Sequence, residues 1–199
     1  MRPRTNDAVG STDRWDAVGL IDRREVLGSI AAIGLVGLAG CTGEETVEPV
    51  SLDGELSCDV CGMIIEDHPG PVGQIHFEDD TEEGGRPAQF CSAICTYEYR
   101  FDAEDAGRTA IETFLTDYST VDYDVYEEAG IVHITSHVGA DAFGPESSLT
   151  LVIGSDSIGA MGPAIVPFGE PDDAAEFADE HGGELFDPAD VDRELIEAL

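Results

Sequence analysis

The chain has 199 residues, of which 43 are Asp or Glu and only 9 are basic, giving a formal net charge of −34. Every basic residue is Arg, and the chain contains no Lys. Such a surface repels nucleic acid and is typical of proteins that stay soluble in concentrated salt. We therefore expect a protein of an extreme halophile without a nucleic-acid partner; the alternative is an acidic face that collects cations or docks a basic partner. An apolar fraction of 42% is enough for the core of one domain or two small ones.

Residues 1–40 are interpreted as an export signal. Arg23 and Arg24 precede an apolar run over 26–40 that is short for a bilayer span. The paired arginines indicate the twin-arginine route, and the small residues before Cys41 resemble the lipobox of exported lipoproteins. We predict a lipid on Cys41, an extracytoplasmic location at the cell membrane, and an acidic, flexible linker over 41–57. The alternative is a short anchor that is not cleaved.

Four further cysteines form two closely spaced pairs. Cys58 and Cys61 are separated by two residues, and Cys91 and Cys95 by three. This spacing lets two short segments grip one metal ion, and Met63 adds a thioether that suits Cu(I). A structural zinc site or two disulfides are the alternatives, because four cysteines remain once Cys41 carries a lipid.

The pattern over 58–199 predicts an α+β domain with possible sub-units 58–120 and 121–199. We expect strands at 72–77, 88–90, 122–126, 130–138, 148–155, 164–168 and 184–186, and a polar hairpin loop at 78–85. Helices are expected after an N-cap at Ser92, over 109–118, over 172–180 and from 191. The order suggests a duplicated strand-strand-helix unit, with metal ligands kept only in the first copy.

Several motifs together resemble the NosL family of copper-binding lipoproteins associated with nitrous-oxide reductase. They are Cys58-x2-Cys61-Gly62-Met63, His68-Pro69-Gly70-Pro71, Gln74-Ile75-His76, Phe90-Cys91-Ser92, Met161-Gly162-Pro163, Pro167-Phe168 and Gly182-Gly183. The first half is also similar to the TRASH and YHS metal-trafficking modules. Cys91 and Cys95 depart from the usual NosL pattern. Copper therefore binds either at Cys58, Cys61 and Met63 alone or at a site shared with Cys91 and Cys95.

The resemblance implies a non-enzymatic chaperone that delivers Cu(I) to nitrous-oxide reductase or its assembly machinery. Cys58 and Cys61 are then thiolate ligands and Met63 a thioether ligand, and His76 and Met161 are weaker candidates for completing the ligand shell. Alternatives are a structural zinc knuckle and a general copper buffer or sensor at the cell surface. A lyase similar to organomercurial lyase would use Cys58 or Cys61 with Cys91 and Asp59, but it gives Met63 no role.

Overall fold

The computed structural model describes residues 46–83 and 85–199, and it confirms the predicted α+β class. The strands are β1 (Gly73–Phe77), β2 (Ala88–Phe90), β3 (Ala110–Thr116), β4 (Val125–Glu128), β5 (Ile131–Ile134), β6 (Phe143–Pro145), β7 (Thr150–Gly159), β8 (Gly162–Phe168) and β9 (Glu184–Phe186). The helices are α1 (Glu78–Glu83), α2 (Ala93–Asp105), α3 (Pro171–His181) and α4 (Arg193–Glu197), with 3-10 turns η1 (Ile65–Asp67), η2 (Ala140–Ala142), η3 (Glu146–Ser148) and η4 (Pro188–Asp190). Within the described residues, every helix is too short or too polar to cross a membrane.

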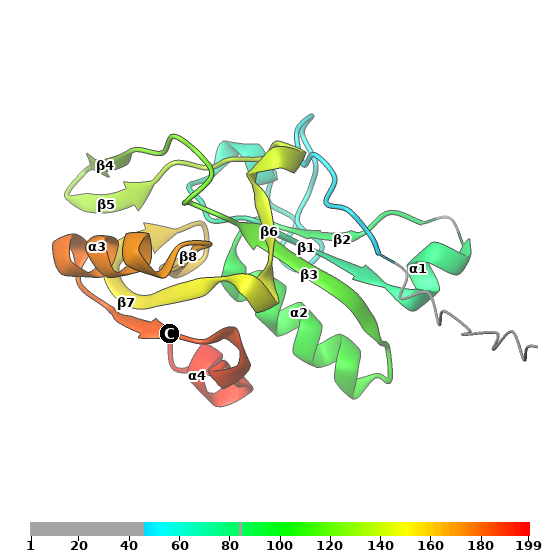
Figure 1. Cartoon of the computed structure of the whole chain (residues 1–199). Helices are drawn as coiled ribbons and strands as arrows, with labels where there is room; N and C mark the ends of the chain where they lie inside the picture. Colours follow the sequence, from blue (N-terminus) through cyan, green and yellow to red (C-terminus); the bar gives the residue numbers. More distant parts are fainter. Residues whose placement is uncertain (1–45, 84) are drawn as a thin grey trace, which may run out of the picture. The chain divides into compact units, whose positions relative to one another are not determined.

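The strands form two sheets (Figure 1). The first has the order β2-β1-β3-β6, and all of its neighbours are antiparallel. The second has the order β4-β5-β7-β8, with β9 also paired to β7. Each sheet contains an antiparallel pair that leads into a helix: β1 and β2 precede α2, and β7 and β8 precede α3. The predicted strand-strand-helix order thus occurs twice.

Helix α2 packs between apolar residues of both sheets. Cys95 and Ala103 belong to an apolar cluster with Ile75 and Phe77 of β1, which we call the first apolar cluster. Ile94 and other α2 residues belong to a second cluster built on β7 and β8. The helix therefore fixes its N-terminal turn, which carries Cys95, against the main body of the domain.

Gly73 sets the approach of β1 to α2. A Cβ at this position would overlap Oγ1 of Thr96 and lie 2.8 Å from Cδ2 of Leu115. We expect Gly73→Ala to lower the free energy of unfolding by about 1–3 kcal/mol, the usual effect of overpacking. Urea unfolding at constant high salt measures this change. Gly107→Ala is not a matched control because Gly107 has φ of +85°. Ala106→Ser, a small change at the exposed C-terminal end of α2, serves instead. Unchanged stability of Gly73→Ala would show that α2 can move away from β1.

Two predicted elements are wrong. Residues 109–118 were expected to form a helix, but Ala110–Thr116 is strand β3, bonded between β1 and β6. Pairing on both edges overrides the local helical pattern, as tertiary context often does. The expected loop at 78–85 contains α1, whose first turn carries three acidic residues that favour a helix N-terminus.

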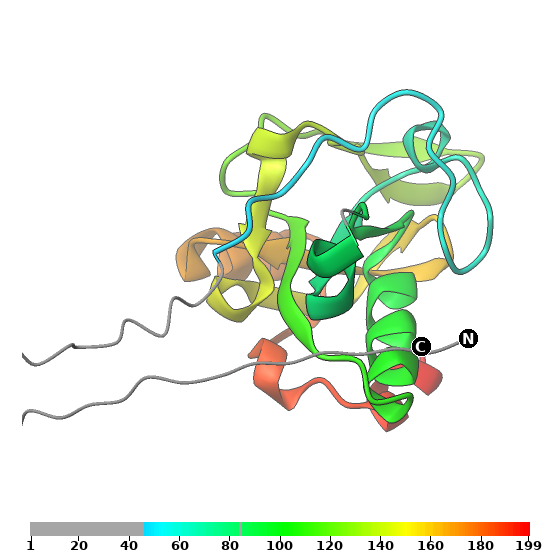
Figure 2. The same cartoon turned by 90° about the vertical axis from the view of Figure 1, so that its right-hand side faces the viewer.

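Part of the segment predicted as a linker lies against the domain. The amide and carbonyl of Val50 pair with the Gln74 side chain at 2.9 and 2.8 Å, and Leu52 is completely buried. Figure 2 shows this segment, in blue to cyan, running across the domain. Val50 and Leu52 are therefore part of the folded domain, although they precede Cys58.

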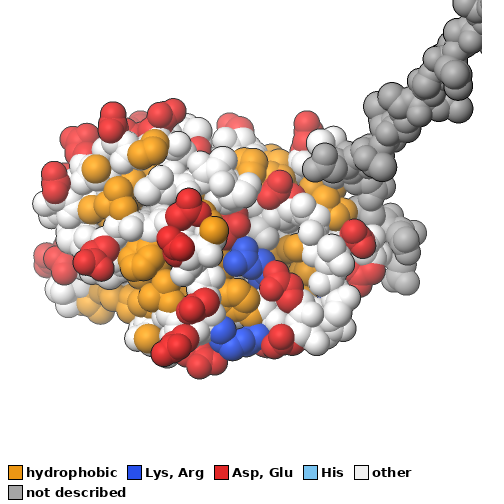
Figure 3. All heavy atoms as spheres, turned by 60° about the horizontal axis from the view of Figure 1, so that its bottom comes forward, with side chains coloured by type: hydrophobic (Ala, Val, Ile, Leu, Met, Phe, Trp, Pro, Cys, Tyr) orange, Lys and Arg blue, Asp and Glu red, His pale blue; other side chains and the backbone are white. Residues whose placement is uncertain are grey.

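On the face shown in Figure 3, acidic side chains are widely spread, and the basic side chains form small patches among them. The described part of the chain contains four arginines, and each forms an ion pair with a carboxylate: Arg86, Arg100, Arg108 and Arg193. The basic groups thus serve mostly to neutralise specific neighbouring acids.

Candidate metal centre

The first half of the site is a tight turn that carries Cys58 and Cys61. The amide of Cys58 donates to the Met63 carbonyl at 2.8 Å, and the amide of Gly62 donates to the Cys58 carbonyl at 2.9 Å. Gly62 has φ of +76°, a left-handed conformation that glycine adopts without strain. The turn therefore folds back so that both thiols lie on the same side.

The second half is the junction of β2 and α2. Cys91 follows the last residue of β2, and Ser92 is the N-cap of α2, accepting a 3.0 Å hydrogen bond from the Cys95 amide. This confirms the predicted cap. The cap places Cys95 in the first turn of α2, where the positive end of the helix favours a thiolate, but the hydrogen bond to Cys58 outweighs this effect and raises the pKa of Cys95.

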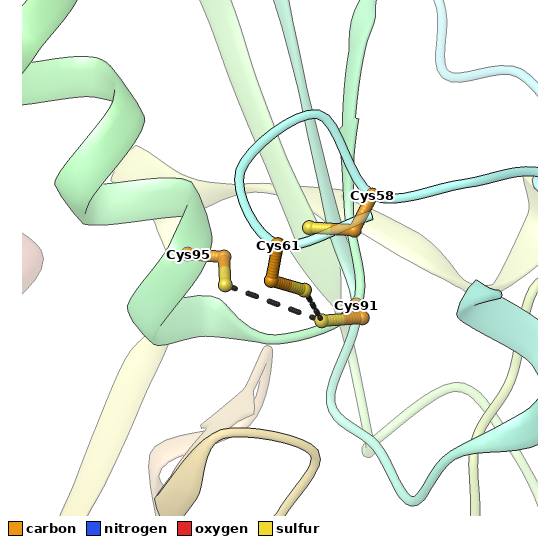
Figure 4. Close-up of side chains that lie close together, drawn as sticks. All are labelled: Cys58, Cys61, Cys91 and Cys95. Atoms are coloured by element: carbon orange, nitrogen blue, oxygen red, sulfur yellow. Dashed lines mark hydrogen bonds between the residues drawn. The ribbon is translucent and has the colours of Figure 1, made fainter. Parts of the chain in front are cut away.

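The two halves bring all four thiols together (Figure 4). The four sulfur atoms lie within 4.8 Å of one another; Cys61 Sγ is 3.4 Å and Cys95 Sγ 4.0 Å from Cys91 Sγ. A tetrahedral ion with metal–sulfur bonds of about 2.3 Å would need sulfurs about 3.8 Å apart. None of these four described cysteines is in a disulfide. The four sulfurs are therefore close enough together to bind one shared ion after small adjustments of their positions.

Exposure and proton affinity differ among the thiols. Cys58, Cys91 and Cys95 are buried, whereas Cys61 is partly exposed. The pKa of Cys58 is lowered because the Cys91 and Cys95 thiols donate hydrogen bonds to its thiolate. Because the Cys91 and Cys95 thiols donate these hydrogen bonds, they hold their protons more tightly: the pKa of Cys91 is raised, and that of Cys95 is raised to about 12. A metal ion that binds all four sulfurs must therefore displace protons held by Cys91 and Cys95.

An ion pair links the two halves beside the thiols. Arg86 donates to both Asp59 carboxylate oxygens, at 2.7 and 2.8 Å, and the Gln89 amide donates to the same carboxylate at 2.9 Å. Partial burial raises the pKa of Asp59, but the bonds from Arg86 and Gln89 outweigh it, so the pKa is lowered. Sequence reasoning missed this pair, because its two members lie 27 positions apart in the chain.

The other predicted ligands occupy different positions. Met63 is partly buried and packs against the first apolar cluster, which also contains Cys58, Cys91 and Cys95. Successive residues of β1 alternate between the face of the sheet that contacts α2 and the opposite face. His76 lies on the opposite face, where its ring meets the Phe114 ring edge-on. Met161 is 42% exposed at the turn between β7 and β8. The structure therefore groups the four thiols and leaves His76 outside this group.

Three predicted residues lie outside the described part of the chain. They are the export-signal residues Arg23 and Arg24 and the predicted lipidation site Cys41.

Comparison with known proteins agrees with the resemblance found in the sequence. A family model described as NosL matches residues 49–196. The copper-binding lipoprotein NosL of Stutzerimonas stutzeri is 29% identical over 175 residues, covering 85% of this chain and 82% of the relative. The crystal structure of the copper chaperone NosL from Shewanella denitrificans has the same fold, with a TM-score of 0.60 at 23% identity, covering 74% of this chain and 97% of that one. Because the family model spans most of the chain and the whole metal centre, the protein belongs to the NosL family.

Proposed function

We propose that the protein is a copper chaperone that binds Cu(I) outside the cytoplasm and is held at the membrane by a lipid on Cys41. The observation that carries the proposal is the group of four converging thiols, with the Met63 thioether in the same apolar cluster. Soft thiolate and thioether ligands favour Cu(I). The relative from Stutzerimonas stutzeri is named a copper-binding lipoprotein, and the protein from Shewanella denitrificans a copper chaperone.

The partly exposed Cys61 gives this carrier a route for release. Cys58, Cys91 and Cys95 are buried, so an incoming ligand of a recipient first reaches the ion beside Cys61. The recipient's ligand bonds to Cu(I) as the Cys61 sulfur leaves, and the copper keeps its oxidation state. Repeating this exchange at the remaining sulfurs moves the ion to the recipient, which we propose to be nitrous-oxide reductase or its assembly machinery.

Replacing Met63 by Leu tests the thioether directly. The two side chains have similar volume, so the fold should remain intact. We expect Met63→Leu to weaken Cu(I) binding about tenfold and to leave Zn²⁺ binding unchanged, because zinc does not require a thioether. Competition with a chromogenic Cu(I) chelator, under anaerobic conditions and in high salt, measures the affinity. Equal Cu(I) affinities for the variant and the native protein would remove Met63 from the ligand set.

A closed zinc site is the second candidate, and the grouping of four thiols, three of them buried, favours it. Metal analysis of the protein purified without oxygen, followed by titration with Cu(I) and Zn²⁺, separates the two functions. A carrier should bind Cu(I) that zinc cannot displace and should transfer it to copper-free nitrous-oxide reductase. Zinc that stays bound through purification and blocks copper uptake would instead make the four cysteines a structural site.

A further inference from the structure

The ion pair between Asp59 and Arg86 lies next to the cysteines of the metal centre. Asp59 lies between the two cysteines of the first turn, directly after Cys58. Arg86 precedes β2, the strand that leads to Cys91. The pair therefore spans the same two segments that a metal ion would join.

Backbone contacts make this connection rigid. The Asp59 amide donates to the Gln89 carbonyl at 2.9 Å, and the Gln89 amide returns a bond of the same length to the Asp59 carboxylate. The Gln89 side chain also donates to the Ser57 carbonyl at 3.0 Å. Arg86 in turn donates to the Pro87 carbonyl at 2.8 Å, which fixes its guanidinium beside β2. The Asp59 carboxylate and the Arg86 guanidinium are thus both attached to the main chain of the segment that leads to Cys91.

Its geometry and burial together separate this pair from the more exposed arginine pairs; Arg108 also binds Asp79 with two hydrogen bonds, but the Asp79 side chain is 58% exposed. Arg86 binds one carboxylate with two parallel hydrogen bonds, the strongest arrangement available to an arginine. Arg193, by contrast, divides its two bonds between Asp102 and Asp105, whose side chains are 75% and 80% exposed. The Asp59 side chain is only 24% exposed. The Asp59–Arg86 contact therefore fixes orientation as well as neutralising charge.

We propose that Asp59 and Arg86 are positioning residues that hold the Cys58–Cys61 turn against Cys91 and thereby set the rate at which the site releases its ion. The inference deepens the proposed carrier function, because release is the step that a carrier must control. Without the pair, the turn keeps the backbone bond from Asp59 to Gln89 and the bond from the Gln89 side chain to Ser57, but it loses the contact that fixes its charged side. The partly exposed Cys61 can then move further from the buried Cys91 and Cys95. An incoming ligand then reaches the ion more easily.

The test is the release of Cu(I) from the loaded full chain to a chromogenic chelator. We expect Arg86→Gln to release the ion about tenfold faster and to bind it about tenfold more weakly, within the range seen when groups that orient metal ligands are removed. Arg86→Lys should restore part of the loss, since an ammonium keeps the charge but cannot form both parallel bonds. Arg193→Gln is the control, because it breaks an exposed arginine pair whose carboxylates, Asp102 and Asp105, lie at the C-terminal end of α2, the end opposite Cys95.

A spectroscopic measurement distinguishes positioning from a general loss of stability. Co²⁺ bound by four thiolates has a strong sulfur-to-metal charge-transfer band, and we expect this band to weaken in Arg86→Gln and not in Arg193→Gln. Native release rates and an unchanged band in Arg86→Gln, or equal changes in Arg193→Gln, would overturn the proposal. If the native protein binds Co²⁺ or Zn²⁺ but no Cu(I), the carrier function fails, and the same comparison made with the bound ion still decides the role of the pair.

Discussion

Cys91→Ser is expected to lower metal affinity by more than about 100-fold, beyond the 10- to 100-fold losses seen when only a supporting group is removed. Cys91 is completely buried, and its sulfur lies 3.4 Å from that of Cys61 and 4.0 Å from that of Cys95. No other thiol can replace a ligand at this central position, and a serine hydroxyl is a poor ligand for a soft ion. Anaerobic titration with Cu(I) and Zn²⁺ measures the loss.

Cys41→Ser is the matched control for this substitution. It makes the same chemical change at a cysteine that precedes the described residues in the sequence. Metal binding should remain at the native level, while fractionation of cells should show the protein released from the membrane if Cys41 carries the lipid. A different result would contradict the shared site. If Cys91→Ser and Cys95→Ser each unfold the domain but the protein still binds one Cu(I) tightly, the two cysteine pairs bind separate ions.

Glu146→Ala is expected to lower the free energy of unfolding by about 3 kcal/mol or more, the usual effect of breaking a buried ion pair. Glu146 is 8% exposed and accepts hydrogen bonds from the Tyr97 hydroxyl at 2.7 Å and from Arg100 at 2.9 Å. Burial, and then the charge of Glu146, raise the pKa of Tyr97, which therefore remains a donor. The substitution leaves the Arg100 charge without this partner between α2 and η3. Urea unfolding at constant high salt gives the free energy.

Asp102→Asn supplies the comparison, because it breaks the exposed contact with Arg193 and should change the stability by less than about 1 kcal/mol. Similar small losses in both variants would show that water reaches Arg100 in the folded protein. The metal affinity of Glu146→Ala should stay near the native value while the protein is folded, since Glu146 does not belong to the thiol group.

The features that were predictable from the sequence are those set by local spacing. The two cysteine pairs, the Ser92 cap and the paired strands that precede α2 and α3 depend on residues close together in the chain. The convergence of the cysteine pairs was a hypothesis, because it required β1 and β2 to pair correctly. The structure now places the four sulfurs within 4.8 Å of one another.

The features that were missed depend on contacts between distant segments. Strand β3 has a sequence compatible with a helix, and its conformation is fixed by hydrogen bonds to β1 and β6. Asp59 and Arg86 are two charged residues in a highly charged chain, and only the fold reveals that they meet.

The attachment of Val50 to Gln74 limits how far the domain can stand from the membrane. Nine peptide steps separate Cys41 from Val50. Even a fully extended chain of that length spans only about 30 Å. With a lipid on Cys41, as proposed, the thiol site is confined to a thin layer of solvent at the membrane surface. A recipient must therefore bring its copper centre, or an intermediate carrier, to that distance from the membrane. A longer segment before Val50 would remove this restriction without altering the metal centre.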